Sequence, residues 1–127
     1  MLKNISVFVV GLIIGCACAA LWMHHHSTAP TFDTAYQTVL LDTGQVYYAK
    51  IEGLGNPFLV LHDVYYVQSS TDPQTKEVKN VLIRRGKELH GPTETVLNSR
   101  HVVLVEPISP SSKVAELISQ QQQSQSK

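Results

Sequence analysis

One segment of the sequence carries no charged residue, and it limits what the N-terminus can fold into. Residues 5–23 read ISVFVVGLIIGCACAALWM. As an α-helix rising about 1.5 Å per residue, the segment would be roughly 28 Å long, close to the ~30 Å hydrocarbon thickness of a bilayer. A helix on a soluble core has a polar face, and this segment has none. The sequence therefore predicts one N-terminal transmembrane helix.

The charges on either side of this segment predict its orientation. Lys3 and the N-terminal amine precede the segment, whereas the first Lys or Arg after it is Lys50. Positive charge close to a span favours the cytoplasmic side, and Trp22 at the distal end is a residue type that prefers the headgroup region. We therefore expect a single-pass membrane protein with a cytoplasmic N-terminus and an extracytoplasmic C-terminal domain.

Two other readings of the segment stay open. Small residues near its end (Ala17, Ala19 and Ala20) fit a cleaved secretory signal, although the apolar run continues to Met23. The sequence IIGC, ending at Cys16, resembles the lipobox of a bacterial lipoprotein, which would make Cys16 the lipidated residue. All three readings place the rest of the chain across a membrane.

Composition limits the chemistry of the remaining domain. The chain has 127 residues, with ten basic and ten acidic residues that cancel, so no net field favours nucleic acid or an anionic surface. Both cysteines, Cys16 and Cys18, lie in the apolar segment. The remaining domain therefore has no disulfide, no thiolate metal site and no cysteine nucleophile.

The rest of the chain reads mainly as short β-strands separated by turns. Asp42, Gly44, Gly53 and Pro57 belong to turn sequences between β-prone runs. So many strands in so short a chain favour a small five- to six-stranded bent barrel or sandwich, because such a sheet leaves few open edges. The expected strands are 35–41, 46–51, 58–68 (bent or broken near His62 and Asp63), 78–85, 95–97 and 101–106.

These observations predict five regions. The segment after the strands has Val114, Leu117 and Ile118 at helical spacing, and the tail is rich in Gln and Ser. The predicted regions are an anchor at 1–23, a juxtamembrane spacer at 24–34, a small β domain at 35–108, a short helix at 109–119 and a disordered tail at 120–127.

The strand order resembles an Sm-like or SH3-like small barrel. A glycine-containing hairpin (LLDTGQVYYAKI) precedes a strand with an aspartate (FLVLHDVYY), and the end (VLNSRHVVLVE) is similar to that fold's strand, tight turn and closing strand. The chain lacks the soluble N-terminal helix of Sm proteins, so the resemblance implies topology and not RNA binding. The whole chain is also similar to single-pass bacterial membrane proteins that share a TGQVYxxK…DVYYVQ…GxELHGP pattern, a likeness that implies no activity.

Histidines are the main candidates for a chemical site. The adjacent His24, His25 and His26 could bind a metal weakly, but neighbouring side chains do not converge easily on one ion. A triad of Ser99, His101 and Asp63 can be written, yet no nucleophile elbow is present. We therefore expect no metal, no cofactor and no enzymatic activity.

Four tyrosines are the candidate binding residues. Tyr47 and Tyr48 are adjacent on one expected strand, and Tyr65 and Tyr66 on the next. Because neighbouring side chains on a strand point to opposite faces, we expect one ring of each pair to pack inward and the other to face out. Two outward rings would form a stacking platform, whereas the plain alternative is ordinary cross-strand pairing.

The combined expectation is a non-enzymatic binding or assembly module of the cell envelope. Its partner would be a protein, and a homo-oligomer is compatible with the sequence. The alternative is a nucleic-acid-binding barrel tethered to the membrane. Its only basic concentration is interleaved with acidic residues, which is typical of a solvated face. That concentration consists of Lys79, Arg84, Arg85, Lys87 and Arg100, with Glu77, Glu88 and Glu94 among them.

Overall fold

The computed structural model describes residues 2–26 and 29–125, and within the first helix the side chains of residues 11–23. The chain forms two compact units, Met1–Pro30 and Thr31–Lys127. The division falls inside the predicted spacer. The first unit contains helix α1 (Leu2–His26), and its described apolar side chains are exposed, with Leu12 at 72% and Leu21 at 70%.

The α1 helix covers the segment in which the sequence predicted a transmembrane span. Within the described part of the chain, no helix is both long enough and apolar enough to cross a membrane. The transmembrane part of the predicted fold thus has no support from the structure and stays a prediction.

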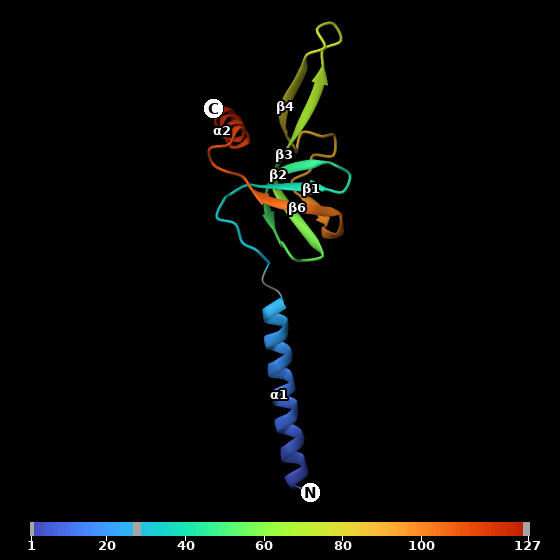
Figure 1. Ribbon diagram of the computed structural model, residues 1–127, viewed down its shortest axis with the longest axis vertical. Helices are drawn as coiled ribbons and strands as arrows, with labels where there is room; N and C mark the ends of the chain where they lie inside the picture. Colours follow the sequence, from blue (N-terminus) through green and yellow to red (C-terminus); the bar gives the residue numbers. More distant parts are fainter. Residues whose placement is uncertain (1, 27–28, 126–127) are drawn as a thin grey trace. The chain divides into compact units, whose positions relative to one another are not determined.

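The second unit is built on a six-stranded antiparallel sheet, which confirms the mainly β prediction (Figure 1). The strand order is β4-β3-β2-β1-β6, and β5 pairs with β3. A three-residue 3₁₀ helix, η1 (Ser99–His101), joins β5 to β6. The strands are β1 (Gln37–Leu41), β2 (Val46–Glu52), β3 (Phe58–Thr71), β4 (Val78–Arg84), β5 (Thr95–Asn98) and β6 (Val102–Pro107).

At Asp63 the long strand β3 changes its pairing partner, and the face of the strand that points toward the main core is reversed. Before this point β3 pairs with β5, and after it β3 pairs with β4. The register with β2 also shifts here, because Lys50 pairs with His62 whereas Tyr48 pairs with Tyr65. One extra residue in β3 thus forms a β-bulge, and Asp63 adopts a positive φ of 47°. The bend predicted near His62 and Asp63 is confirmed as a bulge within one continuous strand.

The second half of β3 and β4 form a hairpin that projects beyond the rest of the sheet (Figure 1). The strand β3 continues to Thr71, past its predicted end. In the hairpin turn, the Asp72 carboxylate accepts hydrogen bonds from the backbone N–H groups of Gln74 and Thr75. These bonds lower the pKa of Asp72 and fix the turn.

The main hydrophobic core is formed by side chains from the strands of the sheet. Its buried side chains are Val39, Ala49, Leu59, Leu61 and Val64, from β1, β2 and β3. On β3 the side chains that enter this cluster are Leu59 and Leu61 before the bulge and Val64 after it, because the extra residue reverses the alternation, and Tyr65 is buried in a different cluster. The half-buried side chains that complete this cluster include members of β5 and β6. The core therefore requires all the strands except β4.

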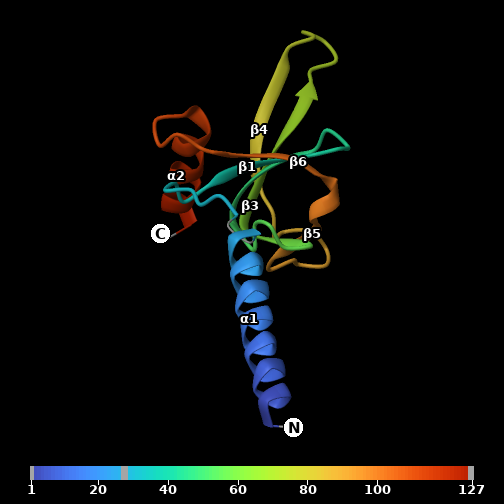
Figure 2. The same ribbon diagram turned by 60° about the horizontal axis from the view of Figure 1, so that its bottom comes forward.

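The C-terminal helix α2 (Lys113–Gln125) packs on the base of the projecting hairpin (Figure 2). Ile118 is buried with Tyr65 and Leu82 in a second, smaller cluster. The predicted helix thus continues through Gln125, into the tail that the sequence predicted to be disordered. Glutamine is a good helix former, and here its side chains find tertiary partners. Gln121 donates to the Leu82 carbonyl on edge strand β4, at 2.6 Å.

Candidate binding surface

The four candidate tyrosines do not form one platform. Tyr65 is fully buried under α2, and Tyr48, its pairing partner across the strands, packs on the same small cluster. Tyr47 and Tyr66 are half-buried and line a common hollow. The structure therefore divides the tyrosines between the α2 contact and a candidate binding surface. No local pattern in the sequence indicates that α2 covers Tyr65.

The smaller hollow combines aromatic rings with an ion pair. It has a volume of about 220 Å³ and is lined by Gln45, Tyr47, Tyr66, Arg85 and Glu88. The Arg85 guanidinium lies 5.8 Å from the centre of the Tyr47 ring, within the range of a cation–π contact. Its Nε donates to Glu88 at 2.9 Å. These contacts fix Arg85 between the two tyrosines' strands and the loop after β4.

Glu88 holds this loop in place from a second direction. Its carboxylate accepts a hydrogen bond from the backbone N–H of Gly86 at 2.6 Å. This bond is the main reason that the pKa of Glu88 is lowered, and the Arg85 side chain contributes as well. Gly86 adopts a φ of 111°, a left-handed conformation that favours glycine. The turn at Gly86 separates Arg85, which lines the smaller hollow, from Lys87, which lines a second, larger hollow.

Asp63 is the centre of a charged cluster next to this surface. Its carboxylate accepts hydrogen bonds from Lys50 Nζ and Arg84 Nη2, both at 2.7 Å. The Lys50 bond, and then the Arg84 bond, lower the pKa of Asp63, although partial burial opposes them. Lys50 lies on β2 and Arg84 on β4, so the bulged residue of β3 is held by cations from both flanking strands.

Tyr36 joins this cluster to α2. Lys50 Nζ lies 5.4 Å from the centre of the Tyr36 ring, and the Tyr36 hydroxyl accepts a hydrogen bond from Gln122. The Tyr36 and Tyr65 rings meet edge to face at 6.1 Å. Burial raises the pKa of Tyr36. The tyrosine is therefore neutral, and packs as an amphipathic link between sheet and helix.

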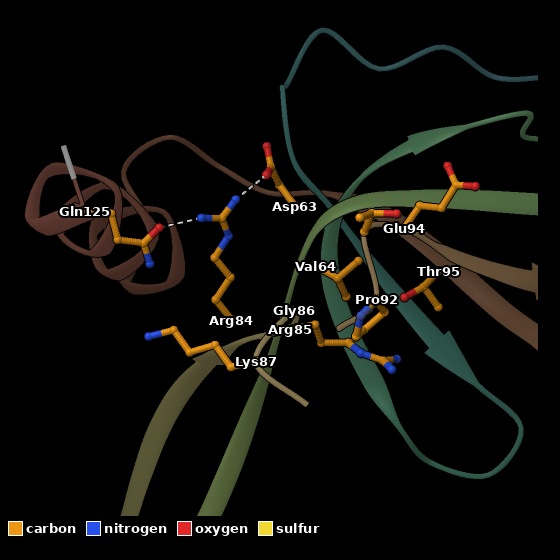
Figure 3. A pocket seen from close by; sticks show the side chains of 11 residues that line it. Asp63, Val64, Arg84, Arg85, Gly86, Lys87, Pro92, Glu94, Thr95 and Gln125 are labelled. Carbon is orange, nitrogen blue, oxygen red and sulfur yellow. Dashed lines mark hydrogen bonds and ion pairs between the residues drawn. The ribbon is translucent and has the colours of Figure 1, made fainter. Parts of the chain in front are cut away.

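A larger hollow of about 400 Å³ lies beside the Asp63 cluster (Figure 3). Arg84 bridges Asp63 and Gln125 at one wall, and Lys87 lies on the same side. Pro92, Thr95 and Glu94 lie on the opposite side (Figure 3). Arg85 lines this hollow as well as the smaller one. Arg85 is thus the side chain that the two hollows share.

The three residues of the hypothetical triad, Ser99, His101 and Asp63, do not come together. Ser99 Oγ donates to the Asn56 carbonyl at 2.6 Å, and His101 Nδ1 lies 2.8 Å from Asp42 Oδ2. Asp63 is engaged in its own cluster. Each of the three side chains therefore has a different partner, and His101 serves to hold the β1–β2 turn against η1.

The remaining predicted positions add no metal centre to the described structure. Among the described residues, no group of three or more metal-binding side chains comes together. The side chains of His24, His25 and His26 lie outside the described part. Cys16 and Cys18 are free and exposed on α1.

The charged cluster around Asp63 was not predicted from the sequence. Lys50, Asp63 and Arg84 lie on three different strands, and nothing in their local sequence links them. One signal was available, because the apolar positions of β3 switch from Leu59 and Leu61 to Val64. That change of parity marks a bulge, and an Asp inside it is a residue that needs partners.

The sequence matches no protein-family model and no curated protein.

Proposed function

We propose that this chain is a non-enzymatic, membrane-anchored binding or assembly module that contacts a protein partner of the cell envelope. The observation that carries this proposal is the pair of hollows joined at Arg85. Tyr and Arg are the residue types that most often dominate the binding energy of protein interfaces. A concave surface with a few fixed polar groups is also the usual form of a binding site.

The contacts of Arg85 suit this role because they fix its position before a partner arrives. Its bond to Glu88 and its contact with the Tyr47 ring hold the guanidinium between the two hollows. A side chain that is already ordered loses less conformational freedom on binding. Tyr66 offers the second aromatic wall at little entropic cost, since its ring is half-buried. A polypeptide with an apolar or aromatic residue fits this smaller hollow.

The proposed anchor is α1. Residues 5–23 carry no charge, and Lys3 precedes them. The described part of this helix exposes Leu12, Leu21 and other apolar side chains, a surface that in water marks a contact with another molecule or a membrane. On this proposal the N-terminus is cytoplasmic and the β unit is extracytoplasmic. A lipid on Cys16, or a cleaved signal, would leave the β unit on the same side.

We further propose that the sheet closes into a small barrel of the Sm-like or SH3-like type. The support is the order of the core strands, β5-β3-β2-β1-β6, with β5 and β6 joined by the three-residue η1. A short link between the two ends of this path brings them together. The β4 strand is then an extension of β3 beyond the barrel.

The alternative function, nucleic-acid binding, finds less support in the side chains. Arg84 and Arg85 are each ion-paired to a carboxylate, at Asp63 and Glu88. A phosphate-binding track needs cations that are free to neutralise phosphates. Arg84 and Arg85 therefore contribute less to such a track than unpaired cations would.

Site-specific photo-crosslinking tests the binding surface. A photoreactive residue at Gln45, which lines the smaller hollow, should give a discrete adduct in intact cells. A probe at exposed Gln120 on α2 is the matched control. The Gln45 adduct should disappear with Tyr66→Ala and with Arg85→Gln, provided circular dichroism shows an intact sheet. Adducts that survive both substitutions in folded protein would overturn the proposal.

A labelling experiment tests the side of the membrane. Ser70 is exposed on the projecting hairpin. A Ser70→Cys variant in intact cells should react with a membrane-impermeant maleimide, whereas the parent chain, with only Cys16 and Cys18, should not. Reaction only after the cells are opened would contradict an extracytoplasmic β unit.

A further inference from the structure

We infer that the larger hollow beside Arg84 and Lys87 binds a carboxylate, supplied by an acidic side chain of the polypeptide that occupies the smaller hollow. This inference rests on the proposed function and adds the chemistry of the partner. It depends on three features, which are the charge of one wall, the fixed position of Arg84 and the side chain of Arg85 that the two hollows share.

The first feature is an excess of positive charge on one wall. The single carboxylate of Asp63 is shared between Lys50 and Arg84. Lys87 lies on the same side of the hollow and forms no ion pair within the described residues. Lys50 does not line the hollow, so on this wall Arg84 and Lys87 face the one carboxylate of Asp63, and one positive charge is not balanced. Glu94, the other acidic residue of the lining, stands on the opposite side (Figure 3).

The second feature is the way in which Arg84 is held. One guanidinium nitrogen donates to Asp63 and another to the side-chain oxygen of Gln125. A guanidinium has five N–H donors, so donors remain for a further acceptor. Hydrogen bonds between Arg and a carboxylate are about twice as strong as those between neutral groups. Lys87 supplies a mobile ammonium that can follow the same acceptor.

The third feature is the position of the hollow on the proposed binding surface. Arg85 belongs to the lining of both hollows. A polypeptide that places an apolar or aromatic residue between Tyr47 and Tyr66 can therefore place a nearby side chain beside Arg84. The volume of about 400 Å³ accommodates an acidic side chain with part of its backbone. The aromatic neighbour is why a polypeptide is favoured over a lipid headgroup or free phosphate.

Nuclear magnetic resonance of the ¹⁵N-labelled full-length chain, in uncharged detergent micelles, tests the inference. The probe is N-acetylglutamate N-methylamide, and its uncharged match is N-acetylglutamine N-methylamide. The acidic probe should shift the amide signals of Gly86, Lys87 and Thr95 in a saturable way. The uncharged probe should shift them much less at equal concentration. Equal shifts from both probes would overturn the inference.

Two lysine variants serve as a matched pair. Lys87→Gln removes a charge from the hollow, and Lys79→Gln removes one from the exposed part of β4. Lys87→Gln should weaken binding of the acidic probe by about fivefold, the range of one partly exposed charge interaction. Lys79→Gln should leave it unchanged. Equal weakening by both variants would show only a general charge effect and would contradict a site.

Inorganic phosphate separates the sources of the anion. Tighter binding of phosphate than of the acidic probe at the same signals would overturn the assignment to an acidic side chain. If the Gln45 crosslink forms but the acidic probe does not bind, this inference fails and the proposed function stands. If the probe binds with the expected lysine dependence but no crosslink forms, the carboxylate site stands and the polypeptide partner fails.

Discussion

The two hydrophobic clusters of the β unit differ in how they are closed. The main cluster consists of apolar side chains enclosed by the strands themselves. The second cluster has three buried members, Tyr65, Leu82 and Ile118, and α2 is its cover. Within the described residues, the Tyr65 hydroxyl is buried with no hydrogen-bond partner. A buried polar atom without a partner destabilises the arrangement that buries it.

The polar contacts at the edge of the second cluster extend this difference. Gln121, Gln122 and Gln125 of α2 hydrogen-bond to Leu82, Tyr36 and Arg84. Each of these bonds contributes modestly, because the same groups would otherwise bond to water. The comparison indicates that the strands fold around the main cluster, while α2 adds a smaller and more polar contact. Four substitutions test this difference between the clusters.

The largest effect is expected from the main cluster. Leu61→Ala should lower the free energy of unfolding by about 2–5 kcal/mol, because Leu61 is fully buried and the cavity cannot be filled easily. Chemical denaturation of the full-length chain in uncharged micelles measures this. Phe58→Ala on the same strand is the control, since Phe58 is 59% exposed, and should have a clearly smaller effect. Equal losses would contradict the placement of the core.

A smaller effect is expected under α2. Ile118→Ala should lower the free energy of unfolding by about 2 kcal/mol, at the low end for such substitutions, because only one side of Ile118 meets the sheet. Hydrogen exchange should show lost protection in α2 and retained protection in β1, β2 and the first half of β3. Ser119→Ala, at the exposed neighbouring position, should change neither. Collapse of protection throughout the sheet would show that the two clusters form one unit.

The charged cluster should contribute less and should depend on pH. Asp63→Asn should lower the free energy of unfolding by about 1 kcal/mol at neutral pH, because the two ion pairs are partly exposed. Asn keeps the tolerance for the positive φ of this position. The loss should be equal at any pH between the range in which the carboxylate titrates and the range in which the Lys50 ammonium titrates, whose pKa the Asp63 bond raises.

The sign of the pH dependence follows from the lowered pKa of Asp63. Its contribution is complete above the pKa of the unfolded chain, about 3.9 for Asp, and is lost as the pH falls through the lower pKa of the folded state. The difference between parent and Asp63→Asn should therefore shrink with acidification. A difference that grows in acid would contradict the cluster.

The smallest effect is expected at Tyr65. Tyr65→Phe should leave the free energy of unfolding within about 0.5 kcal/mol of the parent, or raise it slightly, because the hydroxyl has no partner among the described residues. Tyr36→Phe is the comparison. The Tyr36 hydroxyl accepts a hydrogen bond from Gln122, so its removal should lower the free energy of unfolding more than removal of the Tyr65 hydroxyl. A loss above about 1 kcal/mol at Tyr65 would point to a bound water at its hydroxyl.

Local patterns in the sequence determined the strands, the bend of β3 and the apolar face of α2. Alternating apolar residues, turn-forming glycines and the spacing of Val114 and Ile118 act over a few residues, so they can be read from the chain alone. The long uncharged run at residues 5–23 likewise predicts an anchor from sequence alone, and that prediction remains to be tested. The predicted change from helix to disordered tail at residue 120 was wrong, because a Gln-rich sequence gives no local sign that the segment will pack on the sheet.

Only the tertiary structure decided which side chains meet. The sequence led us to expect one ring of each tyrosine pair to face out, without indicating which one; the fold buries Tyr65 beneath α2 and brings Tyr47 and Tyr66 to a hollow with Arg85. It also brings Lys50 and Arg84 to Asp63 from opposite sides of β3. These contacts depend on the strand register, the bulge and the docking of α2. The sequence determines each of these through interactions between distant residues, which no local pattern displays.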